Sequence, residues 1–396
     1  MNVDNVVSGT QNKTCFGCGV CASACPKKII SIGSNKEGFY VPAIKEPNKC
    51  IQCRICLDVC SFLNPGLALK EPKIQSWAAW SKDDRVRRRC SSGGAGFEIG
   101  KCLIAQGYKV VGCRYNVEKQ RAEHYIAQTI EELVLSIGSK YIQSYTPEAL
   151  LEIDRKQKYL VVGTPCQIDS FRRYIRKFRC EENFVLMDFF CHSVPSMHAW
   201  KEYIRMVEEK VGKITYASWR NKFDYGWYDS RFNGINGDNT SEPVNWHDSY
   251  NLFIRGKRSF IQSRWSRGNL FYRLFLEDVS LGPQCQKQCK FKYDNSSADI
   301  RIGDFWGKTY EKDESGVSAL VAFTENGREI VEGLKGVSLQ EHPFEVVAEG
   351  QMKKNAHAKT LAPIVMWMLR NKMPMKSGLY QAVLFAQRVI NKINSL

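Results

Sequence analysis

The sequence predicts an α/β protein with a small cysteine-rich domain at its N-terminus and a basic helical tail at its C-terminus. Eight of the 16 cysteines in the 396-residue chain fall between Cys15 and Cys60. From about Lys73, strand-like apolar runs alternate with helix-like segments, which favours an α/β domain with a mainly parallel core sheet. From Gln351 to Leu396 there are eight Lys or Arg residues and no Asp or Glu. We therefore expect domains at 1–70 and 71–345 and a tail at 346–396.

Composition narrows the class of protein. Hydrophobic residues make up 43% and charged residues 25% of the chain, which is typical of a soluble globular protein. The N-terminus has no signal-peptide pattern, and the apolar run Leu361 to Leu369 is interrupted by Pro363 and too short to cross a bilayer. We expect a cytoplasmic protein whose cysteines bind metal rather than form disulfides. Despite the net charge of +16, no nucleic-acid-binding module is recognisable.

Two cysteine runs define the N-terminal domain. The first is Cys15-x2-Cys18-x2-Cys21-x3-Cys25, followed by Pro26, and the second is Cys50-x2-Cys53-x2-Cys56-x3-Cys60, followed by Ser61. This spacing is typical of bacterial ferredoxins with two [4Fe-4S] clusters, in which the fourth cysteine of each run binds the other cluster. The expected ligand sets are therefore Cys15, Cys18, Cys21 and Cys60 for one cluster and Cys50, Cys53, Cys56 and Cys25 for the other.

Several details of these runs carry further expectations. Gly17 and Gly19 give the first loop conformational freedom and let backbone amides approach sulfur. Serine replaces the usual proline at position 61, a change that we expect to cost little. The turn Asn64-Pro65-Gly66 indicates the end of the domain. Two four-cysteine zinc sites are the alternative, but zinc sites rarely repeat this run.

The first half of the second domain is predicted from alternation and helix-start signals. A helix at 97–106 precedes a strand at Tyr108–Cys113, and a strand at 124–128 precedes a helix that begins after Thr129, with two glutamates in its first turn. Thr146 is expected to cap another helix. The apolar strand Tyr159–Val162 ends at Gly163, and helix 167–178 follows.

The second half continues the alternation around an insertion. Phe184–Phe190 is predicted as a strand with one interior carboxylate, Asp188, and a helix follows from Ser196 to Glu209. Residues 214–262 are rich in aromatics, Gly and Asn, and are expected to form a β-rich or looped insertion. Strands Ile300–Gly303 and Leu320–Phe323 and a helix at 325–335 complete the domain.

Three short stretches lie where α/β proteins place ligands. Arginines 87–89 and the run Cys90-Ser91-Ser92-Gly93-Gly94 precede a helix, and such a turn suits a phosphate or diphosphate. Gly163-Thr164-Pro165-Cys166-Gln167 and Cys191-His192-Ser193 each follow a strand, where open sheets bind ligands. No GxGxxG fingerprint follows a strand, which argues against a nicotinamide site.

The ordered set of these motifs resembles the coenzyme F-420 hydrogenase/dehydrogenase beta-subunit family, in its form with a fused ferredoxin domain. The set also includes residues 138–144 and Ala298 to Gly307, so that the resemblance runs from Cys15 to about Gly307. Among the members, the chain looks most similar to bacterial proteins associated with polysaccharide loci. The fold class expected on these grounds is α/β, with a bacterial-ferredoxin-like domain followed by an α/β flavin-binding domain, a β-rich insertion and a helical basic tail.

The resemblance implies a flavin, usually FAD, although FMN would serve the same chemistry. The implied flavin contacts are Ser91, Ser92, Gly93, Gly94, Lys140, Tyr141, Gln143, Ser144, Gly163, Thr164, Pro165 and Gln167. A third [4Fe-4S] cluster is also implied, with ligands Cys166, Cys191, Cys285 and Cys289. Here three residues separate the last two cysteines, where members usually have two. Free thiols are the alternative for these four.

We therefore expect an oxidoreductase that passes electrons from a ferredoxin or another redox protein through the clusters to the flavin, and reduces a small organic substrate such as a sugar or glycan precursor. His192 is the candidate acid that protonates the substrate, with a structural role beside the third cluster as the alternative. The alternatives are an electron-transfer subunit of a separate catalytic partner, or a deazaflavin (coenzyme F-420) oxidoreductase. The basic tail is expected to contact a membrane surface, a partner protein or its own domain.

Overall fold

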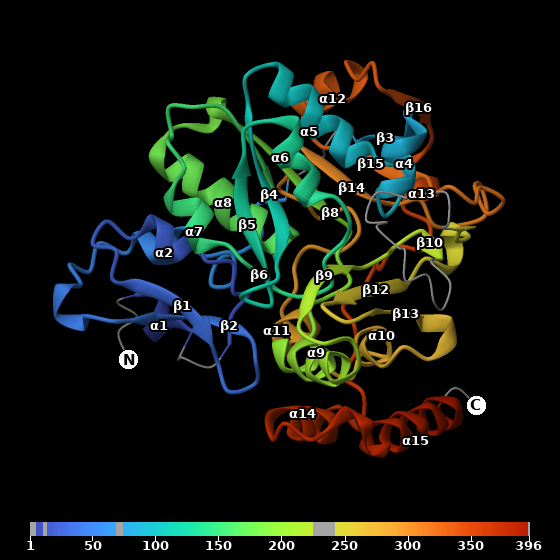
Figure 1. The fold of residues 1–396 in the computed structure, drawn as a ribbon. Coiled ribbons are helices and arrows are strands. Elements are labelled where there is room, and N and C mark those ends of the chain that lie inside the picture. Colours follow the sequence, from blue (N-terminus) through green and yellow to red (C-terminus); the bar gives the residue numbers. More distant parts are fainter. Residues whose placement is uncertain (1–4, 11–13, 69–73, 225–241, 395–396) are drawn as a thin grey trace.

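The computed structural model describes residues 5–10, 14–68, 74–224 and 242–394. The N-terminal domain consists of the antiparallel hairpin β1 (Ile30–Ser34) and β2 (Tyr40–Ile44) with short helices α1 (Val6–Gly9), α2 (Val20–Ala24) and α3 (Ile55–Asp58). α2 carries the third cysteine of the first run, and α3 carries the third cysteine of the second run. This domain lies against one side of the larger domain (Figure 1).

One nine-stranded sheet forms the centre of the larger domain. Strand β3 follows the undescribed link at 69–73, and the remaining strands come from both halves of the α/β sequence. In spatial order they are β16 (Val337–Glu341), β3 (Gln75–Ser81), β15 (Ser318–Ala322), β14 (Ile300–Asp304), β8 (Phe184–Phe189), β7 (Tyr159–Val162), β4 (Lys109–Asn116), β5 (Arg121–Ala127) and β6 (Ser144–Tyr145).

The expectation of a mainly parallel sheet is right only for the middle of the sheet. Strands β14, β8, β7 and β4 run parallel, whereas β5, β15, β3 and β16 each join through an antiparallel pairing, and short β6 pairs parallel with β5. The reason is the connections: β4 reaches β5 through a short turn, and β14 reaches β15 without a crossover helix. Such links can only produce antiparallel neighbours.

Helices cover the sheet and begin close to the predicted positions. Thr129 and Ser196 accept hydrogen bonds from the first turns of α6 and α9, as N-caps do. Thr146 differs, because its hydroxyl donates to the Cys18 carbonyl (2.7 Å) instead of capping α7. The helices are α4 (Asp84–Arg89), α5 (Ala95–Ala105), α6 (Ile130–Leu133), α7 (Pro147–Leu151), α8 (Pro165–Phe178), α9 (Met197–Val211), α10 (Leu270–Leu276), α11 (Pro283–Lys287), α12 (Glu325–Glu332) and α13 (Phe344–Val347).

The described part of the predicted insertion is β-rich. Strands β9 (Ile214–Ser218), β12 (Asn251–Gly256) and β13 (Phe260–Arg264) form a three-stranded antiparallel sheet that packs against α9. β10 (Phe223–Asp224) pairs with β11 (Glu242–Pro243). Residues 225–241 of the insertion lie outside the described residues.

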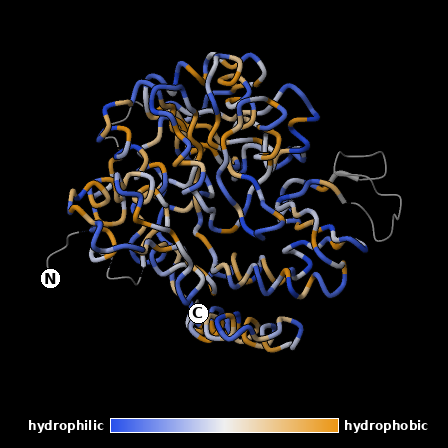
Figure 2. The backbone as a smooth tube through the Cα atoms, turned by 60° about the vertical axis from the view of Figure 1, so that its left-hand side comes forward, coloured by the Kyte–Doolittle hydropathy of each residue, from blue (hydrophilic) through white to orange (hydrophobic). Residues whose placement is uncertain are grey.

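The tail forms two helices, α14 (Ala362–Arg370) and α15 (Leu379–Ile393), which lie below α9 in Figure 1 and as a separate layer in Figure 2. Among the described residues, four cations of the tail pair with the body of the protein: Lys359 with Asp278 (3.9 Å), Arg370 with Glu37 (3.1 Å), Lys376 with Glu209 (2.9 Å) and Arg388 with Glu277 (2.6 Å). The basic composition thus serves, at least in these four pairs, to dock the tail on acidic side chains of its own chain. Among the described residues, no helix is long and apolar enough to cross a membrane.

Candidate functional site

The first cysteine set of the N-terminal domain comes together as the spacing predicts. Burial, followed by the neighbouring Cys18, raises the pKa of Cys60 to about 11. Burial and then Cys18, Cys15 and Cys60 raise the pKa of Cys21 well above its usual value. Like charges at this proximity disfavour free thiolates, and an iron–sulfur cluster relieves both penalties by binding them.

The glycines of the first loop are needed for that arrangement. Gly17 and Gly19 have φ of +68° and +76°, in the left-handed region. The amide of Gly17 donates to the Cys15 sulfur (3.2 Å). A Cβ at Gly17 would lie 2.3 Å from Gln143 Nε2, so the loop must stay bare to lie against the larger domain.

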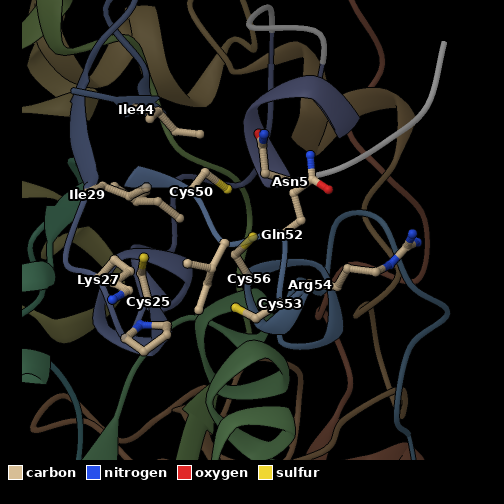
Figure 3. A pocket seen from close by; sticks show the side chains of 13 residues that line it. Asn5, Cys25, Lys27, Ile29, Ile44, Cys50, Gln52, Cys53, Arg54 and Cys56 are labelled. Atoms are coloured by element: carbon tan, nitrogen blue, oxygen red, sulfur yellow. The ribbon is translucent and has the colours of Figure 1, made fainter. Parts of the chain in front are cut away.

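The second set, Cys25, Cys50, Cys53 and Cys56, surrounds one opening near the surface (Figure 3). Cys25 comes from the first run and the other three from the second, so the fourth cysteines are exchanged between the two sets. Cys53 is exposed, whereas Cys56 is buried and has a pKa raised by burial and by its three partners. Within the described residues, no group of three His, Cys, Asp or Glu side chains is arranged around a single ion. Four thiols around an opening fit a cluster, which offers one iron to each thiolate.

A cavity of about 480 Å³ opens behind the N-terminal domain, at the carboxyl ends of the parallel strands. Its volume lies in the range of cofactor and substrate sites. The structure brings eleven of the twelve predicted flavin contacts to its wall: Ser91, Ser92, Gly94, Lys140, Tyr141, Gln143, Ser144, Gly163, Thr164, Pro165 and Gln167.

Gly93 is the exception, and its prediction as a cofactor contact is not supported by its position. A Cβ at Gly93 would lie 2.3 Å from the Ala79 carbonyl oxygen and 2.7 Å from the Ser318 amide. This glycine is therefore required by close packing on strands β3 and β15, away from the cavity.

Two helix N-termini face the cavity and suit a diphosphate. Gly94, with φ +90°, precedes α5 without a side-chain cap, and residues 94–97 line the cavity. Pro165, Cys166 and Gln167 begin α8 and line it as well. Helix N-termini present free N–H groups and a positive dipole end to anions. In α8, Pro165 has no N–H and the Thr164 amide already donates to Gln167 Oε1 (2.9 Å), so this helix offers the Cys166 amide and its dipole end. Together with the first turn of α5, this wall fits the diphosphate of FAD. The site fits a flavin in size and in donor chemistry.

Some of the predicted contacts have side chains that are already engaged. The Lys140 ammonium donates to the carbonyls of Ser136, Ile137 and Gly138, and burial lowers its pKa to about 8. Gln143 accepts from the Tyr40 amide (2.9 Å) and donates to the Phe16 carbonyl (3.1 Å). These two side chains shape the cavity wall, and Gln143 also fastens the N-terminal domain. Arg87, which precedes the serine–glycine turn, pairs with Asp313 (2.8 Å).

The four cysteines expected for a third cluster line one end of the same cavity. Burial is the largest cause of the raised pKa of Cys166, and Cys285, Cys191 and Cys18 add to it. The three-residue gap does not separate Cys285 from Cys289: Cys285 lies on α11, Cys289 follows the end of this helix, and both thiols line the cavity. Cys289 contributes in turn to the raised pKa of Cys285.

His192 lines the cavity beside these cysteines. Its Nε2 lies 2.7 Å from Asp278 Oδ1, and its ring meets Phe275 edge-on. Lys292 donates to the His192 carbonyl (2.7 Å). The Asp278 carboxylate orients the imidazole. In this position His192 supports the cysteine loop, and its ring can exchange a proton with a ligand in the cavity.

Arg220 and Lys222, which come from the insertion, were not predicted from the sequence. Arg220 is fully buried, pairs with Asp304 (2.5 Å), and lies between the rings of Tyr250 and Trp306. The Lys222 ammonium donates to the carbonyls of Arg87, Ser92 and Ser315, and burial lowers its pKa to about 7. Both hold the serine–glycine turn in place. In the sequence, Arg220 and Lys222 belong to no recognisable motif, so nothing there indicates that they hold this turn.

Ser61 links the cysteine sets to the cavity. It is fully buried, its amide donates to Ser170 Oγ (3.0 Å), and its hydroxyl donates to the Cys166 carbonyl (2.9 Å). Ser170 also accepts from the Cys18 thiol (3.3 Å). Serine at this position is therefore a connection between the N-terminal domain and α8, and a proline could make neither bond.

His124 predicts a measurable pH dependence of stability. Its Nε2 lies 2.9 Å from the Val162 carbonyl, and burial lowers its pKa to about 4. The unfolded chain binds a proton near pH 6.5, so stability is complete above about 6.5 and is lost as the pH falls towards about 4. From about pH 7.5 to about 5.5 the native protein should lose about 1 kcal/mol more than His124→Gln. Anaerobic thermal unfolding checks this difference, and parallel pH profiles for the two proteins would contradict it.

Comparison with known proteins gives one match for the N-terminal cysteine-rich domain and another for the larger domain. Residues 156–345 match the family described as the C terminus of the coenzyme F420 hydrogenase/dehydrogenase beta subunit, and residues 14–63 match the 4Fe-4S dicluster domain. A solved structure of the F420-reducing [NiFe] hydrogenase complex from Methanosarcina barkeri is similar at a TM-score of 0.43 and 15% identity, over 78% of this chain and 90% of that chain. No curated protein matches the chain significantly.

Proposed function

Because the chain belongs to the coenzyme F420 hydrogenase/dehydrogenase beta-subunit family and carries a 4Fe-4S dicluster domain in front of it, we propose that it is an iron–sulfur flavoprotein oxidoreductase. It takes single electrons from a ferredoxin-like donor, and it reduces a small organic substrate in the cavity. We propose a sugar or glycan precursor as the substrate, on the resemblance to polysaccharide-locus members.

One observation carries the proposal: the three cysteine sets follow one another from the surface to the cavity. Cys56 of the exposed set contributes to the raised pKa of Cys21. Cys18, in the same set as Cys21, contributes to that of Cys166 at the cavity. Each set therefore lies near the next, and Ser170, which accepts from the Cys18 thiol (3.3 Å) and the Ser61 amide (3.0 Å), connects the buried set to α8. A continuous series of this kind suits single-electron transfer from the surface inward.

The cavity supplies the other requirement, a place for a two-electron carrier and a substrate. A bound flavin supplies hydride chemistry and exchanges single electrons with clusters. The amides at the start of α5 and the Cys166 amide of α8 would hold its diphosphate, and Ser91, Ser92 and Tyr141 line the same space. His192, oriented by Asp278, is the group that we propose delivers a proton to the substrate.

Anaerobic purification with iron, sulfide and flavin measured on one sample tests this proposal. We expect about twelve irons per chain, which corresponds to three [4Fe-4S] clusters, together with one flavin. Cys166→Ala should lower the iron content to about eight while the dicluster spectrum is retained, because four irons are lost with one cubane. Cys102→Ala, a cysteine outside all three sets, is the matched control.

Other outcomes would correct the proposal in different ways. About eight irons with flavin in the native protein would remove only the third cluster. About eight irons without flavin, even after reconstitution, would overturn the enzyme and leave an electron-transfer subunit of a separate catalytic partner. Reduction of coenzyme F-420 by the purified protein would instead identify a deazaflavin oxidoreductase.

A further inference from the structure

The rim of the exposed cysteine set is strongly basic. Residues 25–57 contain six Lys or Arg and two Glu. Lys27 and Arg54 line the opening itself together with Cys25, Cys50, Cys53 and Cys56 (Figure 3). Lys28, Lys45 and Lys49 are exposed on the same loops.

Both glutamates of this segment are already paired. Glu46 lies 2.5 Å from Lys49, and Glu37 pairs with Arg370 of the tail (3.1 Å). Asp58, which follows the segment, pairs with Lys177 from α8 (2.8 Å). The surface around the opening therefore presents an excess of positive charge.

An exposed apolar side chain lies within this rim. Ile51, between Cys50 and Gln52, is 58% exposed and lines the opening. Gln52 and Arg54 adopt left-handed backbone, with φ of +52° and +61°. A small apolar contact ringed by charge is typical of transient redox complexes, which form small interfaces and associate by electrostatic steering.

We propose that this face, defined by Lys27, Lys28, Lys45, Arg54 and Ile51, is the docking site for an acidic one-electron carrier protein of the ferredoxin class. The inference rests on the proposed function and adds to it the surface and the charge of the partner. Docking here places the carrier directly against the exposed Cys53. The buried set and the cavity lie behind it, so no other set in the described residues offers an exposed thiol.

The proposal is tested with the double variant Lys27→Glu/Lys45→Glu and a reduced acidic ferredoxin as probe. The control is Lys257→Glu/Lys335→Glu, which changes the net charge equally at exposed positions on other parts of the larger domain. At low ionic strength, we expect the affinity of the first variant for ferredoxin and its rate of reduction by ferredoxin each to fall at least about tenfold. Both quantities should be unchanged in the control. Native binding should weaken steeply between about 20 mM and about 200 mM salt, and the variant should lose this dependence.

A second electron donor distinguishes loss of ferredoxin docking from a change in the reactivity of the cluster itself. Methyl viologen is a small cation, so charge reversal at the rim should leave its rate of electron transfer unchanged or raise it. Ile51→Asp should weaken ferredoxin binding without slowing methyl viologen. Equal slowing with both donors, or unchanged ferredoxin binding in the double variant, would overturn the docking site. Because ferredoxin affinity is measured directly by calorimetry, failure of the proposed enzyme activity would leave this result interpretable.

Discussion

Asp188→Ala is expected to lower the free energy of unfolding by about 3–5 kcal/mol, because it leaves a buried guanidinium without its counter-ion. Asp188 and Arg301 are both fully buried and joined by two hydrogen bonds of 2.7 Å. Arg301 also donates to the Tyr293 carbonyl (2.6 Å), on the loop between Cys289 and β14. The same variant should therefore lose iron from the cavity cluster before the dicluster.

Anaerobic unfolding and iron analysis measure both effects. Glu118→Ala, an exposed carboxylate, is the control and should change stability by less than about 0.5 kcal/mol. The double variant Asp188→Leu/Arg301→Met removes both charges and should recover most of the loss, since apolar pairs of similar volume replace buried ion pairs at little cost. A single variant no less stable than Glu118→Ala would refute the assigned role of the pair.

Ser61→Pro is expected to destabilise the protein by about 2–4 kcal/mol, because two buried hydrogen bonds lose a partner. The substitution removes the amide that donates to Ser170 and the hydroxyl that donates to Cys166. Ser170 also accepts from Cys18 of the buried cysteine set (3.3 Å), and Cys166 belongs to the cavity set, so Ser61 connects the two sets. Electron transfer from the dicluster to the cavity should consequently slow, which stopped-flow absorbance after rapid reduction can follow.

Two variants frame this result. Pro26→Ser makes the reverse exchange at the corresponding, exposed position of the first run and should change stability by less than about 1 kcal/mol. Ser61→Ala keeps the amide and loses only the hydroxyl, so it should lie between the native protein and Ser61→Pro. If Ser61→Pro and Pro26→Ser behaved alike, the connection through Ser170 would not hold the two domains together.

Much of the fold could be predicted from local patterns. Tyr159–Val162 forms a strand with the predicted bounds, and the strand from Phe184 ends one residue early, at Phe189. Whether neighbouring strands are parallel or antiparallel could not be predicted, because the apolar pattern of a strand does not show which strand it pairs with. The turn at 117–120 makes β4 and β5 an antiparallel pair, and alternation alone does not reveal this.

The site divides in the same way. Spacing alone predicted the two dicluster sets, since three thiols separated by two residues lie on one loop. The cavity residues Ser91, Gly163 and Cys166 were indicated by their places before a helix or after a strand, and the resemblance implied their ligands. The packing roles of Arg220 and Gly93 could not be predicted, because they depend on partners that are distant in sequence: Asp304 for the first, Ala79 and Ser318 for the second.

The fastening of the N-terminal domain has a kinetic consequence. Gln143 binds the backbone of residues 16 and 40, Thr146 binds Cys18, and Lys290 donates to the Ser61 carbonyl (2.9 Å). A ferredoxin on a flexible tether would have to swing between its donor and its acceptor in each cycle. Here these hydrogen bonds hold the N-terminal domain in one position against the larger domain. Electron entry then requires only that the carrier arrive at the docking face, so at carrier concentrations below saturation the rate should rise with carrier concentration and fall with solvent viscosity.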